Sequence, residues 1–167
     1  MCRKNLQRQR RQQYGGGIMY WGMVLPNGLI YLKDMEGYIN AEKYISLLKT
    51  YAVPIMKLNL KPGFHFVQDN CSCHVAKKTK KFLNTQNFNV LNWPSKSPDL
   101  NIMENIWSIL TDLIYDEEQP KDKKELKNRL MKAVHTINTE KRSIVLNLYH
   151  TYRERLVNVL KCKGNLV

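Results

Sequence analysis

The sequence predicts a single domain of the α/β class, a sheet flanked by helices. Its 167 residues are 43% hydrophobic, which is enough apolar material for one core. Phe64, Phe66 and Val67 are typical of a buried strand, and the carboxylates Asp69 and Glu104 follow it with 34 residues between them. One crossover helix and one returning strand fit that interval. Such a βαβ step would bring both carboxylates to the same edge of the sheet.

The first third of the chain predicts a hairpin and a helix. Two apolar runs, residues 18–24 and 29–32, flank the turn signal at residues 26–28, which reads Pro-Asn-Gly. Asn40 is a candidate N-cap for a helix over residues 41–51, where apolar side chains recur at helical spacing.

Boundary signals divide the middle of the chain. We expect Pro54 and then residues 61–63, Lys-Pro-Gly, to break the chain before the strand that leads to Asp69. His74 begins the next helix, and residues 88–91 form the returning strand. Ser97-Pro98 is typical of a helix start and would open the helix that carries Glu104 near its N-terminus.

After Pro120 the pattern is helical and basic. Two apolar stripes recur at helical spacing, and we expect both to be buried. The first stripe is Leu126, Leu130, Val134 and Ile137, and the second is Ile144, Leu148, Tyr152, Leu156 and Leu160.

Asp69 and Glu104 would offer hard oxygen ligands at one sheet edge. Mg²⁺ and Mn²⁺ prefer such ligands, retain several waters and complete their coordination with phosphate oxygens. A phosphodiester is therefore the natural substrate.

The motifs around these carboxylates resemble the DDE catalytic domain of mariner-superfamily transposases. They are QDN with a following His (residues 68–74), WP-x-x-SPDLN (residues 93–101) and EN-x-W (residues 104–107). The spacing of 34 residues between the last two acids is similar to that family's. Residues 15–32, 40–48 and 148–164 extend the resemblance to both sides.

The resemblance implies an RNase H-like fold, with a mixed sheet, flanking helices and a helical C-terminus. It implies DNA cutting and joining by two-metal phosphoryl transfer, as in DNA transposition and integration, with Mg²⁺ or Mn²⁺ as cofactor. Asp69 and Glu104 are then the catalytic metal ligands. The surrounding motif residues are Asn70, His74, Asn101 and Asn105.

One expected acid is missing. The resemblance implies a first Asp on a first, central strand, yet no acidic residue precedes Asp34, which matches no catalytic position. We interpret residues 1–14 as a basic arm or truncation remnant and residues 15–167 as a partial catalytic domain. We expect a gap in the sheet, weak or absent metal binding, and no strand transfer by the chain alone.

The formal net charge of +13 indicates a polyanionic partner, and DNA is the first candidate. We expect DNA contacts from the lysines that follow Asp69, which are Lys77, Lys78, Lys80 and Lys81. An intact transposase or a second copy is a further candidate partner. We expect a nuclear location, no membrane association and no small-molecule cofactor.

Two other functions stay open. The chain is either a module that binds DNA or a transposase without catalysis, or a decayed transposon reading frame with no selected function. The missing first Asp favours the binding module over the enzyme, and poor folding would indicate decay.

Cys71, Cys73 and His74 suggest zinc. A structural zinc site normally has a second ligand pair at similar spacing, and the sequence offers only Cys162. We therefore interpret these cysteines as incidental.

Overall fold

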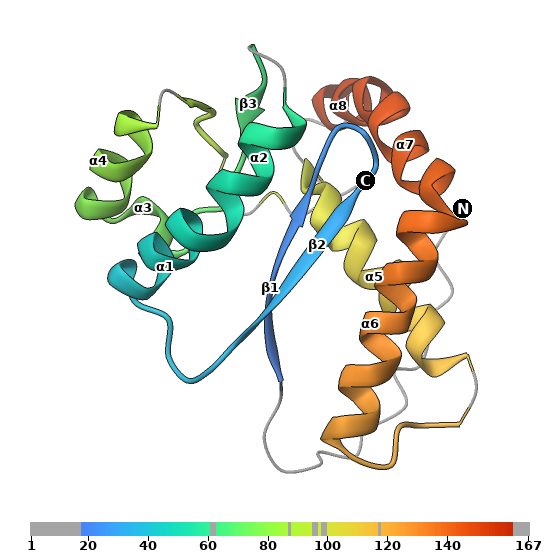
Figure 1. Ribbon diagram of the computed structural model, residues 1–167. Coiled ribbons are helices and arrows are strands. Elements are labelled where there is room, and N and C mark those ends of the chain that lie inside the picture. Colours follow the sequence, from blue (N-terminus) through green and yellow to red (C-terminus); the bar gives the residue numbers. More distant parts are fainter. Residues whose placement is uncertain are drawn as a thin grey trace.

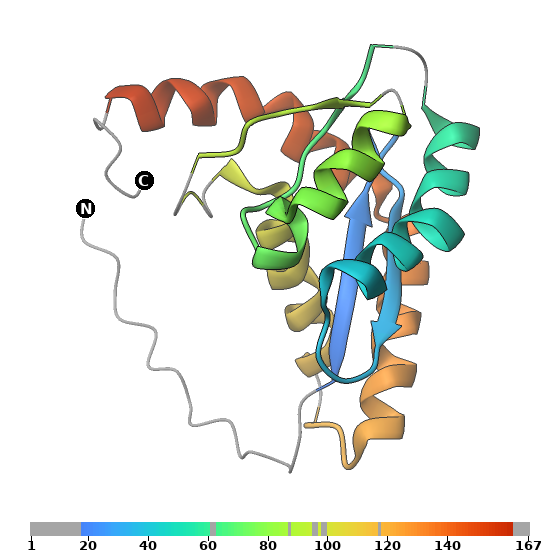
Figure 2. The same ribbon diagram turned by 90° about the vertical axis from the view of Figure 1, so that its left-hand side faces the viewer.

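A β-hairpin lies at the centre of the fold (Figures 1 and 2). The computed structural model describes residues 18–60, 63–86, 88–94, 97, 100–116 and 118–161. Strands β1 (Met19–Val24) and β2 (Ile30–Met35) pair antiparallel, from Met19 opposite Met35 to Val24 opposite Ile30. Gly28 takes a φ of 83° in the connecting turn, which the Pro-Asn-Gly signal predicted.

The helical segment after the hairpin is longer than predicted. It comprises α1 (Ala41–Leu47), the π-helical turn η1 (Leu48–Ala52) and α2 (Val53–Asn59). Asn40 is the N-cap, as expected, and its side chain accepts a hydrogen bond from the Lys43 N–H at 2.9 Å. The expected break at Pro54 is wrong. Pro54 lies in the first turn of α2, where a missing backbone N–H is tolerated.

A βαβ unit follows, as predicted. Strand β3 (His65–Phe66) pairs parallel with β4 (Asn89–Val90), and α3 (Ser72–Val75) and α4 (Lys77–Thr85) connect them. The prediction that the strand before Asp69 is buried is wrong, because the Phe64 and Val67 side chains are each 43% exposed.

Four helices complete the described chain: α5 (Ile102–Tyr115), α6 (Lys123–Thr139), α7 (Arg142–His150) and α8 (Tyr152–Lys161). Leu130, Val134 and Ile137 of the first predicted stripe are buried. No helix among the described residues is long and apolar enough to cross a membrane.

The second predicted stripe is not buried. Ile144 is 41% exposed and Leu160 is 77% exposed, while Val145 is the buried residue of α7. Helix α8 contributes no buried residue, because it extends beyond the elements that would cover it (Figure 2).

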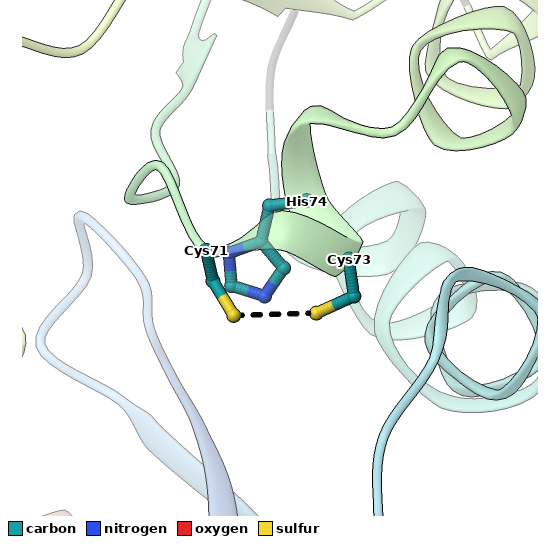
Figure 3. A group of neighbouring side chains, drawn as sticks. All are labelled: Cys71, Cys73 and His74. Atoms are coloured by element: carbon teal, nitrogen blue, oxygen red, sulfur yellow. Dashed lines mark hydrogen bonds between the residues drawn. The ribbon is translucent and has the colours of Figure 1, made fainter.

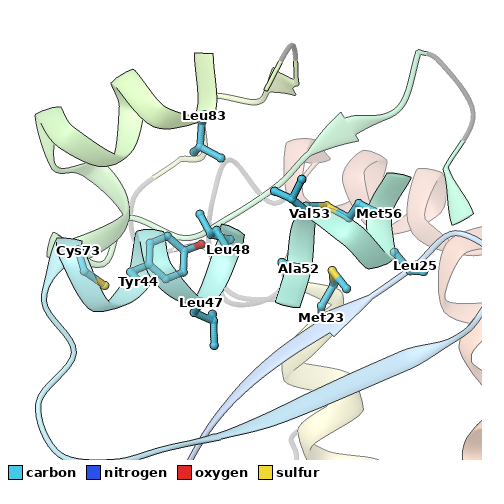
Figure 4. Close-up of a cluster of buried hydrophobic side chains, with 10 residues drawn as sticks. All are labelled: Met23, Leu25, Tyr44, Leu47, Leu48, Ala52, Val53, Met56, Cys73 and Leu83. Carbon is cyan, nitrogen blue, oxygen red and sulfur yellow. The ribbon is translucent and has the colours of Figure 1, made fainter. Parts of the chain in front are cut away.

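The hairpin separates two apolar cores, because side chains alternate between the two faces of a strand. On one face, Met23 and Leu25 pack with buried side chains from α1, η1, α2, α3 and α4 (Figure 4). On the other face, Ile30 and Leu32 pack with buried side chains from α5, α6 and α7. The protein is therefore layered, with helices on both sides of a small sheet.

The strands form two separate sheets. β1 pairs with β2 and β3 pairs with β4, and no strand of the described residues joins the two pairs. Directly after β1, the Leu25 N–H donates to the Leu29 carbonyl at 2.8 Å. Because ladder bonds alternate along an antiparallel pair, the backbone groups of Tyr20, Gly22 and Val24 point away from β2. The break between the β1–β2 sheet and the β3–β4 sheet, called the interruption below, agrees with the fold class that the sequence predicts.

Asn138 of α6 closes the outer edge of β2. Its side chain accepts from the Ile30 N–H at 2.9 Å and donates to the Ile30 carbonyl at 2.8 Å. Ile30 is fully buried, so these backbone groups have no access to water as a substitute.

We expect Asn138→Ala to lower the free energy of unfolding by about 1–3 kcal/mol, because it leaves a buried N–H and C=O unsatisfied. Urea unfolding followed by circular dichroism measures the effect. Asn147→Ala on the exposed face of α7 is the matched control and should change stability little. Equal losses in both variants would contradict this role for Asn138.

Candidate metal and phosphodiester site

A groove of about 510 Å³ runs along the interruption between the two sheets. Residues 20–26 of the hairpin line one side, and residues 64–69 line the other. Asp69 and Glu104 both lie on its wall, together with His74 and Asn101. The structure thus brings the two predicted carboxylates to one groove, although they come from different elements.

Asp69 lies in the loop between β3 and α3. Its Oδ1 accepts a hydrogen bond from the Cys71 N–H at 3.0 Å and lies 2.6 Å from His74 Nδ1. The side chain is 56% exposed. One carboxylate oxygen is therefore held by the protein, and Oδ2 is the oxygen that a cation would bind.

His74 is held on several sides. Its ring centroid is 4.2 Å from that of Tyr44, and its backbone carbonyl accepts from Gln68 Nε2 at 3.2 Å. The Tyr44 hydroxyl donates to Gln68 Oε1 at 2.9 Å. Burial raises the pKa of Tyr44, so the hydroxyl stays protonated as the donor. His74 therefore helps to hold the Asp69 loop in place.

Glu104 projects from the first turn of α5 and is exposed. The predicted start at Ser97-Pro98 is wrong: α5 begins at Ile102, and Pro98 lies outside the described residues. Asn101 is the N-cap, and its side chain accepts from the Met103 N–H at 3.0 Å.

Gly22 sets the distance between α5 and β1, which sequence reasoning missed. A Cβ at this position would clash with Met103 Cε and lie 2.8 Å from Trp107 Cζ2. Gly22 itself, inside the predicted strand, was the available signal, because a glycine inside a strand often marks a close approach. Gly22 therefore lets the helix that carries Glu104 pack directly on the strand.

The other motif residues support the site from outside. Asn70 Nδ2 donates to the Trp93 carbonyl at 2.9 Å, which links the loops after β3 and β4. Asn105 Oδ1 accepts from Arg155 Nη1 at 2.7 Å, which links α5 to α8. Neither contact involves Asp69 or Glu104.

Carboxylate oxygens are ligands that hard cations such as Mg²⁺ prefer, and both predicted carboxylates line this groove. Among the described residues, no third carboxylate lines it. In the part of the chain that the structure describes, neither Asp69 nor Glu104 belongs to a group of three metal-ligating side chains.

The predicted DNA-binding lysines, Lys77, Lys78, Lys80 and Lys81, are all exposed on α4 and do not line the groove. Lys78 Nζ lies 2.7 Å from Glu42 Oε1. That contact raises the pKa of Lys78 and lowers the pKa of Glu42. Lys78 is thus partly neutralised by its neighbour.

The chain is similar to known proteins in sequence and in fold. Residues 3–127 match the family described as DDE superfamily endonuclease. The chain is 27% identical to the Tc3 transposase of Caenorhabditis elegans over 157 residues, which are 93% of this chain and 47% of that protein. It is 32% identical to the Tcb1 transposase of Caenorhabditis briggsae over 96 residues, 58% of this chain and 35% of that protein. The chain thus spans about half or less of these relatives.

Solved structures show the same fold. The Mos1 mariner paired end complex with Mn superposes with a TM-score of 0.80 and 18% identity, covering 95% of this chain and 47% of that one. The Mos1 transposase catalytic domain with Raltegravir and Mg gives a TM-score of 0.65 and 17% identity, covering 84% and 73%. The fold is RNase H-like.

We expect Gly22→Ala to destabilise the protein by about 1–3 kcal/mol, because the added methyl group overpacks the contact with Met103 and Trp107. Urea unfolding of Gly22→Ala, of Trp107→Phe and of the double variant measures the loss in free energy of unfolding for each. The double variant should lose less than the sum of the single losses, because the indole atom nearest the new methyl is gone. Additive losses would show that the two residues do not meet.

Proposed function

The chain belongs to the DDE superfamily endonuclease family, and we propose that it is a transposase-derived DNA-binding protein that is inactive alone in strand transfer. The observation that carries the proposal is the placement of Asp69 and Glu104 on one groove. It supports descent from enzymes that cut and join DNA, while the number of carboxylates argues against a complete site.

DNA is the proposed partner on grounds of charge. The chain has 27 Lys and Arg residues against 14 Asp and Glu residues, and the lysines of α4 follow Asp69 closely in sequence. A phosphate backbone drawn to α4 would pass near the groove, because the Asp69 loop leads directly into α3 and α4. The nucleus is the proposed location, since that is where such a partner lies.

Asp69 Oδ2 and the Glu104 carboxylate are the proposed ligands of one Mg²⁺ or Mn²⁺ ion. Such an ion, when bound, would withdraw charge from a phosphate oxygen. The chain's own part is to hold Asp69 through His74 and the Cys71 N–H, and Glu104 at the start of α5. A second ion, which clamps the leaving oxygen in two-metal chemistry, has no further carboxylate in the groove among the described residues.

A nicking assay tests catalysis. We expect no Mn²⁺-dependent nicking of supercoiled DNA by the chain at low salt, whereas Asp69→Ala and Glu104→Ala should still retard DNA. Asp112→Ala, an exposed carboxylate further along α5, is the control. Nicking that is lost in the Asp69 and Glu104 variants but kept in the control would overturn the proposed inactivity.

A charge-matched pair of variants tests the DNA surface. Replacing Lys77, Lys78, Lys80 and Lys81 by Gln should weaken DNA binding and lower the slope of log K against log salt by up to about 3–4, because each phosphate contact contributes about 0.9. The control replaces Lys121, Lys123, Lys124 and Lys132, which are exposed around α6, and changes the net charge equally. Equal effects would mean that charge acts without a defined surface.

A further inference from the structure

Cys71, Cys73 and His74 form a compact group of metal-ligating side chains at the start of α3 (Figure 3). Their ligand atoms all lie within 4.8 Å of one another, and the two sulfur atoms are 3.5 Å apart. Cys71 is the N-cap of α3, and Cys73 and His74 lie within that helix. Cys73 is buried and Cys71 is exposed, which gives the group one open side.

The imidazole of His74 is oriented for a ligand. Its Nδ1 is 2.6 Å from Asp69 Oδ1, so Nε2 is the nitrogen available to a metal. Figure 3 shows a ring nitrogen directed toward the space between the two sulfurs. A carboxylate on the far nitrogen is the usual partner of a metal-binding histidine, because it fixes the ring and raises its basicity. The Tyr44 ring, 4.2 Å from the His74 ring, restricts it further.

We propose that Cys71, Cys73 and His74 bind one thiophilic cation, Zn²⁺, with water as the fourth ligand. Two sulfurs bound tetrahedrally at ~2.3 Å from Zn²⁺ lie about 3.8 Å apart, close to the separation seen here. Thiolate and imidazole ligands select Zn²⁺ over Mg²⁺, which separates this site from the carboxylates of the groove. From the sequence we set zinc aside for want of a second ligand pair, whereas the fold gathers these three side chains without one.

The site has a structural consequence for the groove. Asp69 Oδ1 contacts His74, so a bound cation would fix the Asp69 loop through the imidazole. The proposal does not depend on DNA binding or catalysis, because it rests only on this cluster.

Titration of the reduced chain, residues 1–167, with Co²⁺ tests the proposed zinc site. Co²⁺ should give a sulfur-to-metal charge-transfer band and the visible bands of a tetrahedral site at one equivalent, and Zn²⁺ should displace them. Cys71→Ser should abolish the charge-transfer intensity of a two-sulfur site and weaken binding at least tenfold. Because Cys71 is exposed, its substitution is not expected to prevent folding.

The controls separate this cluster from other thiols and from the carboxylate pair. The double variant Cys2→Ser with Cys162→Ser removes the other two cysteines and should leave the titration unchanged. Asp69→Asn should weaken Co²⁺ binding about 10–100-fold without changing the band positions, whereas Glu104→Ala should have no effect. Absence of the bands, or bands that survive Cys71→Ser, would overturn the proposal.

Discussion

The interruption of the sheet between β1 and β3 is the constraint on which the rest of the structure depends. Each strand pairs on one side only, and buried backbone groups without partners are costly. Asn138 closes the outer edge of β2 at Ile30, and on the open edge of β1 the Tyr149 hydroxyl donates to the Val24 carbonyl at 3.4 Å. The remaining edge groups face a groove, so the two apolar cores are built on either face of the hairpin and not across a continuous sheet.

The candidate site is formed by residues from both sides of this interruption. Asp69 follows β3 on one side of the interruption, and Glu104 lies on α5, which packs on β1 at Gly22 on the other side. The relation between the two carboxylates therefore depends on how the two sheets are held together. Contacts such as Asn70 with Trp93 and Asn105 with Arg155 stiffen each half. Asp69 and Glu104 therefore line one groove although they belong to different halves of the structure.

Local signals in the sequence predicted much of the fold. The turn at Gly28, the N-cap at Asn40, the βαβ unit and the convergence of Asp69 and Glu104 depend on neighbouring residues or on fixed connection lengths. Features set by distant contacts were missed. Pro54 continues a helix because η1 precedes it, and Leu160 is exposed because no described element packs over that end of α8. The approach at Gly22 and the role of His74 beside Cys71 and Cys73 required the folded geometry.

Amide hydrogen exchange in β1, followed residue by residue by NMR, tests the interrupted sheet most directly. Trp21 and Met23 direct their backbone groups to β2, whereas Tyr20, Gly22 and Val24 direct theirs to the groove. We expect protection to alternate along the strand, with the Trp21 and Met23 amides exchanging slowly and those of Tyr20, Gly22 and Val24 exchanging fast. Uniform protection of all five amides would show that another strand fills the groove and would contradict the account.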